Sequence, residues 1–138
     1  LTPQSVYKMG GYRVQGRTAE QAKLLIEDAK MLEDAGAFAV VLELVPREVA
    51  GMITSELEIS TIGIGAGLEC DIQVLVLHDL VGMTFGRQPR FVRQYASVRN
   101  VMTEAIQHWT RDVKTGAYPN DEESYGLTEE TKKEMAAS

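Results

Sequence analysis

A carboxylate directly follows one of the most apolar segments of the chain. Residues 38–42 run Phe-Ala-Val-Val-Leu, and Glu43 comes next. The carboxyl ends of parallel strands line the active sites of α/β proteins, so a strand over 38–43 would turn Glu43 toward a substrate. A carboxylate in that position could act as a general base. Capping of the helix expected from Pro46 stays open as the alternative role.

Two further groups stand where strands are expected to end. Residues 63–67 (Gly-Ile-Gly-Ala-Gly) could hold an anion on main-chain amides, although we favour a tight turn. They do not form a dinucleotide fingerprint, because no helix is expected directly after them. His78 and Asp79 could polarise a substrate oxygen, but a locally hydrogen-bonded histidine is the commoner finding. Cys70 has no evident base or metal partner and is expected to be inert.

The composition of the chain argues against some classes of function. The chain has 138 residues and a net charge of −6, with acidic and basic residues mixed along most of its length. Nucleic-acid binding would need a clustered basic surface, and a membrane span would need about 20 apolar residues in a row. The sequence has neither. One cysteine and two histidines allow no internal disulfide and no histidine-based metal site, which fits a cytoplasmic protein.

Capping signals and apolar runs outline the elements that would position these residues. Helices are expected from Thr18, which forms a capping box with Gln21, to Gly36; from Pro46 onward; over 89–95; and over 98–114, ended by Gly116. Buried strands are expected at 38–43, 61–64 and 73–77, the first covered on both faces. A short helical turn should begin at Thr2-Pro3 and stop at Gly10, and a weak helix could begin at Thr128.

Apolar residues at helical spacing define the faces that these helices should bury. The first helix should use Ala22, Leu25, Ala29 and Leu32, the second Val49, Met52, Ile53 and Leu57, and the last Val98, Val101, Ala105, Trp109 and Val113. The last of these stripes, with Trp109, is expected to lie in a core or a subunit interface.

Alternation of strands and helices predicts parallel βα units in an α/β fold. A (β/α)8 TIM barrel takes about 250 residues, so this chain would cover about half of one. Residues 1–119 would form that half-barrel, and residues 120–138, rich in charge, an acidic and mobile tail. The chain opens on Leu1 rather than methionine, and we expect a fragment, a processed product or part of something longer.

Seven segments in order resemble one family. They are residues 1–6, 10–17, 41–46 (Val-Leu-Glu-Leu-Val-Pro), 62–67, 78–80, 89–92 and 116–119. In this order they resemble the C-terminal half of ketopantoate hydroxymethyltransferase, and the similarity runs from Leu1 to about Ser124. The first two segments and the Leu-Glu strand end carry the resemblance, whereas the glycine run alone would be weak.

The resemblance implies a fold and a reaction. The family has a barrel of the phosphoenolpyruvate mutase type, forms a decamer, and transfers a hydroxymethyl group from 5,10-methylenetetrahydrofolate to 3-methyl-2-oxobutanoate, giving 2-dehydropantoate for pantothenate. A divalent metal, usually magnesium (Mg2+), holds the keto acid and polarises its ketone. Glu43 matches the family glutamate that removes the C3 proton.

The remaining functional residues of the family precede the position of Leu1. We therefore expect no metal site in this chain, no assigned substrate-binding residue, and no activity without the N-terminal half of the barrel. Leu44 stands where many members have cysteine, and Ile72 where glycine usually follows the aspartate. Two alternatives stay open: a related barrel carbon–carbon lyase or mutase, and a non-catalytic half-barrel subunit.

Overall fold

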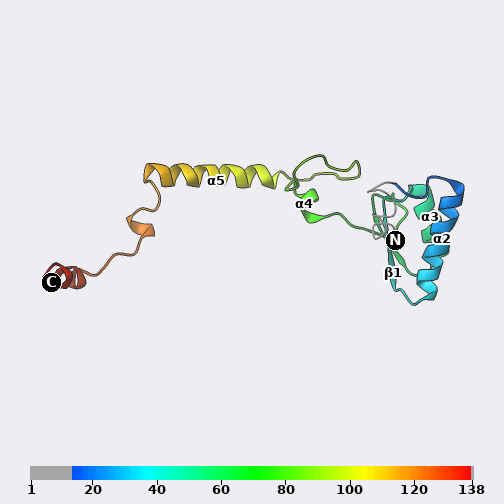
Figure 1. Cartoon of the computed structure of the whole chain (residues 1–138), viewed down its shortest axis with the longest axis horizontal. Coiled ribbons are helices and arrows are strands. Elements are labelled where there is room, and N and C mark those ends of the chain that lie inside the picture. The colour runs from blue at the N-terminus through cyan, green and yellow to red at the C-terminus, as the bar shows by residue number, and fades with distance from the viewer. Residues whose placement is uncertain (1–13, 138) are drawn as a thin grey trace. The chain divides into compact units, whose positions relative to one another are not determined.

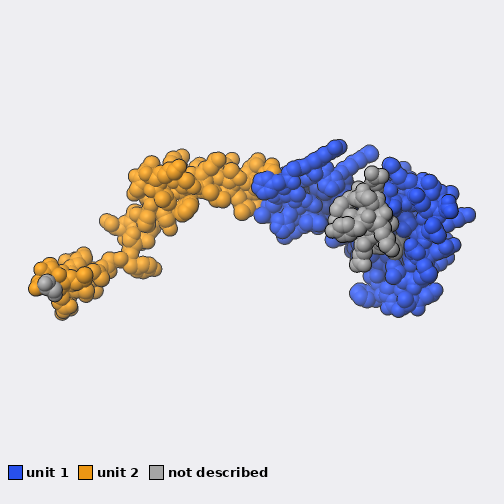
Figure 2. All heavy atoms as spheres, viewed as in Figure 1, with its two compact units in different colours: residues 1–96 blue, residues 97–138 orange. Residues whose placement is uncertain are grey.

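The computed structural model describes residues 14–137, and the short turn expected between Thr2 and Gly10 lies outside them. The chain divides into two units, Leu1–Ala96 and Ser97–Ser138, which are coloured separately in Figure 2. The boundary expected near residue 119, with a mobile tail beyond it, stays a prediction.

The first unit is a parallel sheet with two helices packed against it (Figure 1). Its elements are α2 (Ala19–Asp34), β1 (Ala39–Glu43), α3 (Arg47–Glu56), β2 (Ser60–Ile64), β3 (Ile72–Gln73) and α4 (Leu77–Leu80). The strand order is β1-β2-β3, and both pairings are parallel. The parallel α/β arrangement predicted from the sequence is therefore confirmed.

Helix α2 begins where its capping residues stand. The Thr18 hydroxyl accepts a hydrogen bond from the Gln21 N–H at 3.2 Å, which satisfies one of the unpaired donors of the first turn. The Gln21 side chain accepts from the Arg17 N–H at 3.2 Å, so its return bond reaches one residue beyond the cap. At the other end, the Glu33 carboxylate accepts from the N–H groups of Glu58 and Ile59, at 2.7 and 2.9 Å. These bonds tie the end of α2 to the start of β2.

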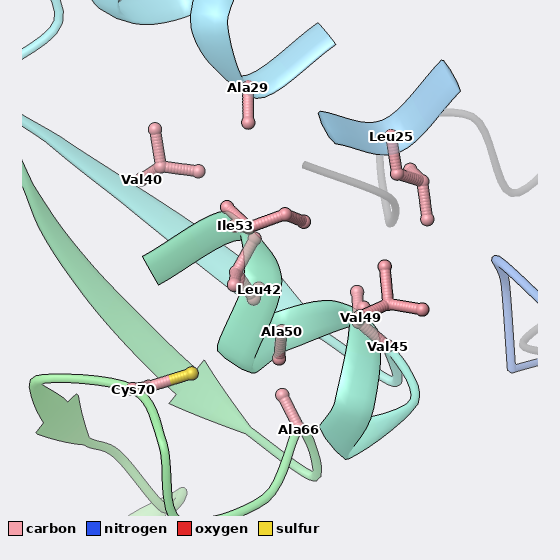
Figure 3. Packing of buried hydrophobic residues seen from close by; sticks show 10 residues of the cluster. All are labelled: Leu25, Ala29, Val40, Leu42, Val45, Val49, Ala50, Ile53, Ala66 and Cys70. Carbon is pink, nitrogen blue, oxygen red and sulfur yellow. The ribbon is translucent and has the colours of Figure 1, made fainter. Parts of the chain in front are cut away.

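The core lies between the helices and one face of the sheet (Figure 3). Its buried members are Leu25 and Ala29 of α2, Val40 and Leu42 of β1, Val49, Ala50 and Ile53 of α3, and Val45, Ala66 and Cys70 of the connections. Ala50 takes the place expected for Met52, which is 53% exposed, and Leu32 is also exposed. Helix α3 therefore turns the face through Val49, Ala50 and Ile53 to the sheet.

Side chains of β1 alternate between this core and the opposite face. Val40 and Leu42 are buried, whereas Val41 is 43% exposed. Val41 pairs with Ile62 and Glu43 with Ile64, and partners in a parallel register share a face. The expectation that β1 is covered on both faces is wrong for the described residues, because α2 and α3 pack on one of them.

The third strand is shorter than predicted. It covers Ile72–Gln73, and one more bond follows, from the Val74 N–H to the Gly63 carbonyl at 3.0 Å. Beyond that point β2 ends at Ile64, and within residues 14–137 no partner strand continues beside residues 75–77. Leu77–Leu80 instead form the short helix α4.

The helix expected over 89–95 is also wrong. Arg90 and Phe91 form a turn, and residues 92–97 are irregular. The Tyr95 N–H donates to the Leu80 carbonyl at 2.8 Å, so its backbone bond goes to another segment rather than to a helical turn.

The second unit contains α5 (Val98–Thr115), the 3-10 turn η2 (Asp121–Glu123) and α6 (Glu129–Ala136). Gly116 ends α5 in the left-handed conformation with φ 73°, and Thr128 caps α6, as the sequence predicts. No residue of α5 is buried, and Trp109 is 55% exposed, so the expected core or interface role of its apolar stripe stays a prediction. Among the described residues no helix is long and apolar enough to cross a membrane.

Candidate active site

Glu43 is the last residue of β1, as the sequence predicts. It lies beside Ile64, the last residue of β2, so the two strands end at the same edge of the sheet. The side chain is partly buried. It shares its face with Val41, Ile62 and Ile64, since parallel partners and alternate residues point the same way. Glu43 is thus a carboxylate at the carboxyl end of an otherwise apolar sheet face.

The backbone turns sharply directly after Glu43. Leu44 has φ 55°, in the left-handed region, where a residue with a side chain stores about 1–3 kcal/mol of strain. Two backbone bonds hold it there: its N–H donates to the Ile64 carbonyl at 3.1 Å, and its carbonyl accepts from the Gln15 N–H at 3.1 Å. Pro46, not Glu43, is the N-cap of α3. The turn therefore holds Glu43 at the end of β1, where the chain leaves the strand.

The glycine run behaves as a packing turn. Gly65 and Gly67 have φ values of 63° and 91°. A Cβ on Gly67 would lie 2.4 Å from the Arg47 Cβ and 3.0 Å from its Cα, and a Cβ on Gly65 would lie 2.8 Å from the Phe91 ring. Both positions need glycine because neighbouring chain approaches too closely for any side chain. The geometry supports the turn interpretation over an anion cradle.

Partly buried hydrogen bonds hold the far end of this loop against β2. The Thr61 N–H donates to Asp71 Oδ2 at 2.8 Å, and the Thr61 hydroxyl donates to the same oxygen at 3.1 Å. The Asp71 N–H returns a bond to Thr61 Oγ1 at 3.2 Å, and the Thr54 and Thr61 hydroxyl oxygens are 2.8 Å apart. Thr61 is fully buried. This network fixes the connection between β2 and β3.

Hydrogen bonding and burial shift the pKa values of two side chains in this region. Hydrogen bonds from the Thr61 N–H and hydroxyl lower the pKa of Asp71, because they stabilise the carboxylate. Burial raises the pKa of the Cys70 thiol, although hydrogen bonding to Thr61 and Thr54 acts in the opposite direction. A thiol with a raised pKa is a weak nucleophile, which agrees with the inert role expected for Cys70.

Asp71 predicts a pH dependence of stability. A carboxyl whose pKa is lowered by folding stabilises the folded protein above its unfolded pKa of about 3.9, and this contribution is lost as the pH falls through the folded pKa. Asp71→Asn should therefore lower the thermal midpoint at pH 6, and the gap to the wild type should narrow below about pH 4. Thermal scans from pH 3 to 7 measure this, with Asp28→Asn on exposed α2 surface as the control. A gap that is equal at pH 3 and pH 6 would contradict the assignment.

His78 and Asp79 do not end a strand. Both lie in α4, where the His78 side chain is exposed and its carbonyl accepts from the Met83 N–H at 2.7 Å. The Asp79 carboxylate accepts a short hydrogen bond from the Thr84 hydroxyl. The structure thus brings together Glu43 and the glycine loop at one sheet edge, and gives His78 and Asp79 a local role. His108 lies exposed on α5, in the other unit.

An open hollow of about 710 Å³ begins at the end of β2. Its lining includes Gly65, Gln73, Phe91, Arg93 and Tyr95. Neither Arg93 nor Tyr95 is predicted as a site residue from the sequence. Only the segment 89–92 next to them carried a signal, and it did so as part of the family resemblance.

Among residues 14–137 no three histidine, cysteine, aspartate or glutamate side chains are grouped so as to hold a metal ion.

Comparison with known proteins places the chain. Residues 1–121 match the family model of ketopantoate hydroxymethyltransferase. A 3-methyl-2-oxobutanoate hydroxymethyltransferase from Koribacter versatilis is 55% identical over 130 residues, and one from Clostridium botulinum is 54% identical over 129 residues; each alignment covers 94% of this chain. The chain spans 44% and 47% of the length of these two relatives. It belongs to the ketopantoate hydroxymethyltransferase family.

Proposed function

We propose that this chain supplies the second half of a cytoplasmic (β/α)8 barrel enzyme. The enzyme transfers a hydroxymethyl group from 5,10-methylenetetrahydrofolate to 3-methyl-2-oxobutanoate and yields 2-dehydropantoate. The observation that carries the proposal is the position of Glu43, at the carboxyl end of a parallel strand in a chain of this family. Active sites of barrels lie at that end of the strands.

The proposed role of Glu43 is proton removal. Its carboxylate takes the proton from C3 of the keto acid, and the C–H electron pair forms the enolate. Water adds to the methylene carbon of the folate and both of its C–N bonds break, which releases tetrahydrofolate and formaldehyde. The enolate carbon then adds to the formaldehyde carbon, and the formaldehyde oxygen takes up a proton to become the new hydroxyl group. An apolar strand face of Val41, Ile62 and Ile64 around Glu43 would exclude water from the enolate.

In this proposal, other parts of the enzyme bind magnesium and make most of the contacts with the substrates. By the family resemblance the ligands of the metal ion would belong to the N-terminal half of the barrel, and among residues 14–137 no three histidine, cysteine or acidic side chains are grouped to hold one. When bound there, the metal would supply Lewis-acid polarisation of the ketone. We therefore propose two kinds of partner for this chain. One is the N-terminal half of the same barrel, and the other is further copies of the protein in a homo-oligomer.

Product analysis tests the reaction. A full-length protein containing this chain should form 2-dehydropantoate from the two substrates and should exchange the C3 proton of 3-methyl-2-oxobutanoate for deuterium when folate is absent. Mass spectrometry of the products and proton NMR of the exchange measure both. Cleavage of a carbon–carbon bond in the keto acid, without transfer, would instead support the lyase or mutase alternative. The absence of both exchange and product would favour a structural subunit.

A further inference from the structure

The hollow beside the glycine loop has a mixed lining. Its walls are Gly65, Leu68, Gln73, Val74, Leu75, Leu80, Phe91, Arg93 and Tyr95. Most of these are aliphatic or aromatic, one carries a positive charge, and none is acidic. The volume of about 710 Å³ is in the range of sites for small organic molecules.

Four segments of the first unit build the hollow and are held together by contacts. Phe91 packs on Gly65, where its ring leaves no room for a Cβ. The Gln73 amide nitrogen donates to the Gly67 carbonyl at 2.8 Å, which holds β3 to the glycine loop. The Tyr95 N–H donates to the Leu80 carbonyl at 2.8 Å, which holds the Arg93–Tyr95 segment to α4. One backbone hydrogen bond, one hydrogen bond from a side chain and the close packing of Phe91 therefore hold these segments in place.

The hollow begins at the same sheet edge as Glu43. Gly65 directly follows Ile64, and Ile64 is the strand partner of Glu43. Val74 is two residues beyond Ile72, which pairs with Ile62, so Val74 belongs to the sheet face that carries Glu43. A ligand in the hollow would lie at the carboxyl ends of β2 and β3, the side where barrel substrates bind.

The lining selects a ligand with two parts. Phe91 and Tyr95 offer aromatic surface, and leucine and valine side chains add apolar wall, which suits a flat apolar ring. Arg93 offers a planar pair of donors that matches a carboxylate. We propose that this hollow binds the aromatic one-carbon carrier of the reaction, with Arg93 holding a carboxylate of the carrier. This inference rests on the proposed function and assigns the carrier to residues of this chain.

Substitution of Arg93 in the full-length protein tests the site. Arg93→Gln should raise the KM for 5,10-methylenetetrahydrofolate by about tenfold, the loss expected for one charge-assisted hydrogen bond. The KM for 3-methyl-2-oxobutanoate should change far less, because that substrate binds elsewhere. Arg93→Lys keeps the charge and should recover part of the loss. Arg87→Gln, an exposed arginine outside the lining, is the matched control.

A truncated carrier distinguishes loss of the carboxylate contact from a general disturbance of the hollow. A 5,10-methylenetetrahydropteroate amide, which keeps N10 and the aromatic ring and lacks the glutamate carboxylates, should react with wild type and Arg93→Gln at similar kcat/KM. Equal carrier KM values in wild type and Arg93→Gln, or an equal rise in Arg87→Gln, would overturn the proposed site. Failure of the wild type to exchange the C3 proton would instead count against the proposed function, since that exchange needs no carrier.

Discussion

Glu43→Gln in a full-length protein containing this chain is expected to lower the rate of C3 proton exchange by about 10²–10⁴-fold, the usual contribution of a general base. Glutamine keeps the shape of the side chain at the end of β1 and cannot accept the proton. Affinity for the keto acid should change little, because the proposal assigns its binding to the metal and to residues outside this chain. The loss should therefore fall on turnover rather than on substrate binding.

Deuterium exchange into 3-methyl-2-oxobutanoate without folate isolates this step, and calorimetry of keto-acid binding supplies the second measurement. Glu48→Gln is the matched control, because Glu48 lies on the first turn of α3 and pairs with Arg47 in an exposed ion pair. Exposed pairs of this kind contribute little to stability. Exchange near the wild-type rate in Glu43→Gln would leave Glu43 with a structural role, and His78 would become the next candidate for the base.

The placement of Glu43 follows from local sequence signals. A five-residue apolar run is long enough for a strand, and Pro46 soon after it starts the next helix, so the carboxylate between them must stand at the strand end. Caps at Thr18 and Thr128 and the stop at Gly116 are local in the same sense. Each depends on hydrogen bonds between residues no more than about four positions apart, so the residue types that form them stand close together in the sequence.

The parts that could not be predicted depend on distant partners. Residues 73–77 are as apolar as a strand, yet their pairing with β2 ends at Gly63, one residue before β2 itself ends. Phe91 lies on Gly65 across 26 positions of sequence, and no local pattern shows that contact. The hollow with Arg93 and Tyr95 depends on it. Such a site needs the tertiary arrangement before its residues can be identified.

The second prediction concerns the exposed face of the sheet. A partner that covers this face should restore activity. Ile72 and Val74 are 49% and 47% exposed, and each Å² of apolar surface left in water costs about 25 cal/mol. Strand β1 and strand β3 are the outer strands of the sheet formed by the described residues, and such edges favour pairing with further strands. A barrel would cover both the face and the edges. We therefore expect the chain by itself to associate and to show only background turnover.

Mixing or co-expressing this chain with a polypeptide that corresponds to the N-terminal half of its relatives should raise turnover from background to a measurable rate. The reason is that metal ligands and base would then stand at one barrel mouth, and the apolar sheet face would be buried. Product formation measures the gain, and sedimentation measures the assembly. A chain with Glu43→Gln is the matched control: it should assemble equally well and stay inactive. A stable monomer of the chain alone would contradict the expected association, and assembly without turnover would identify a structural subunit.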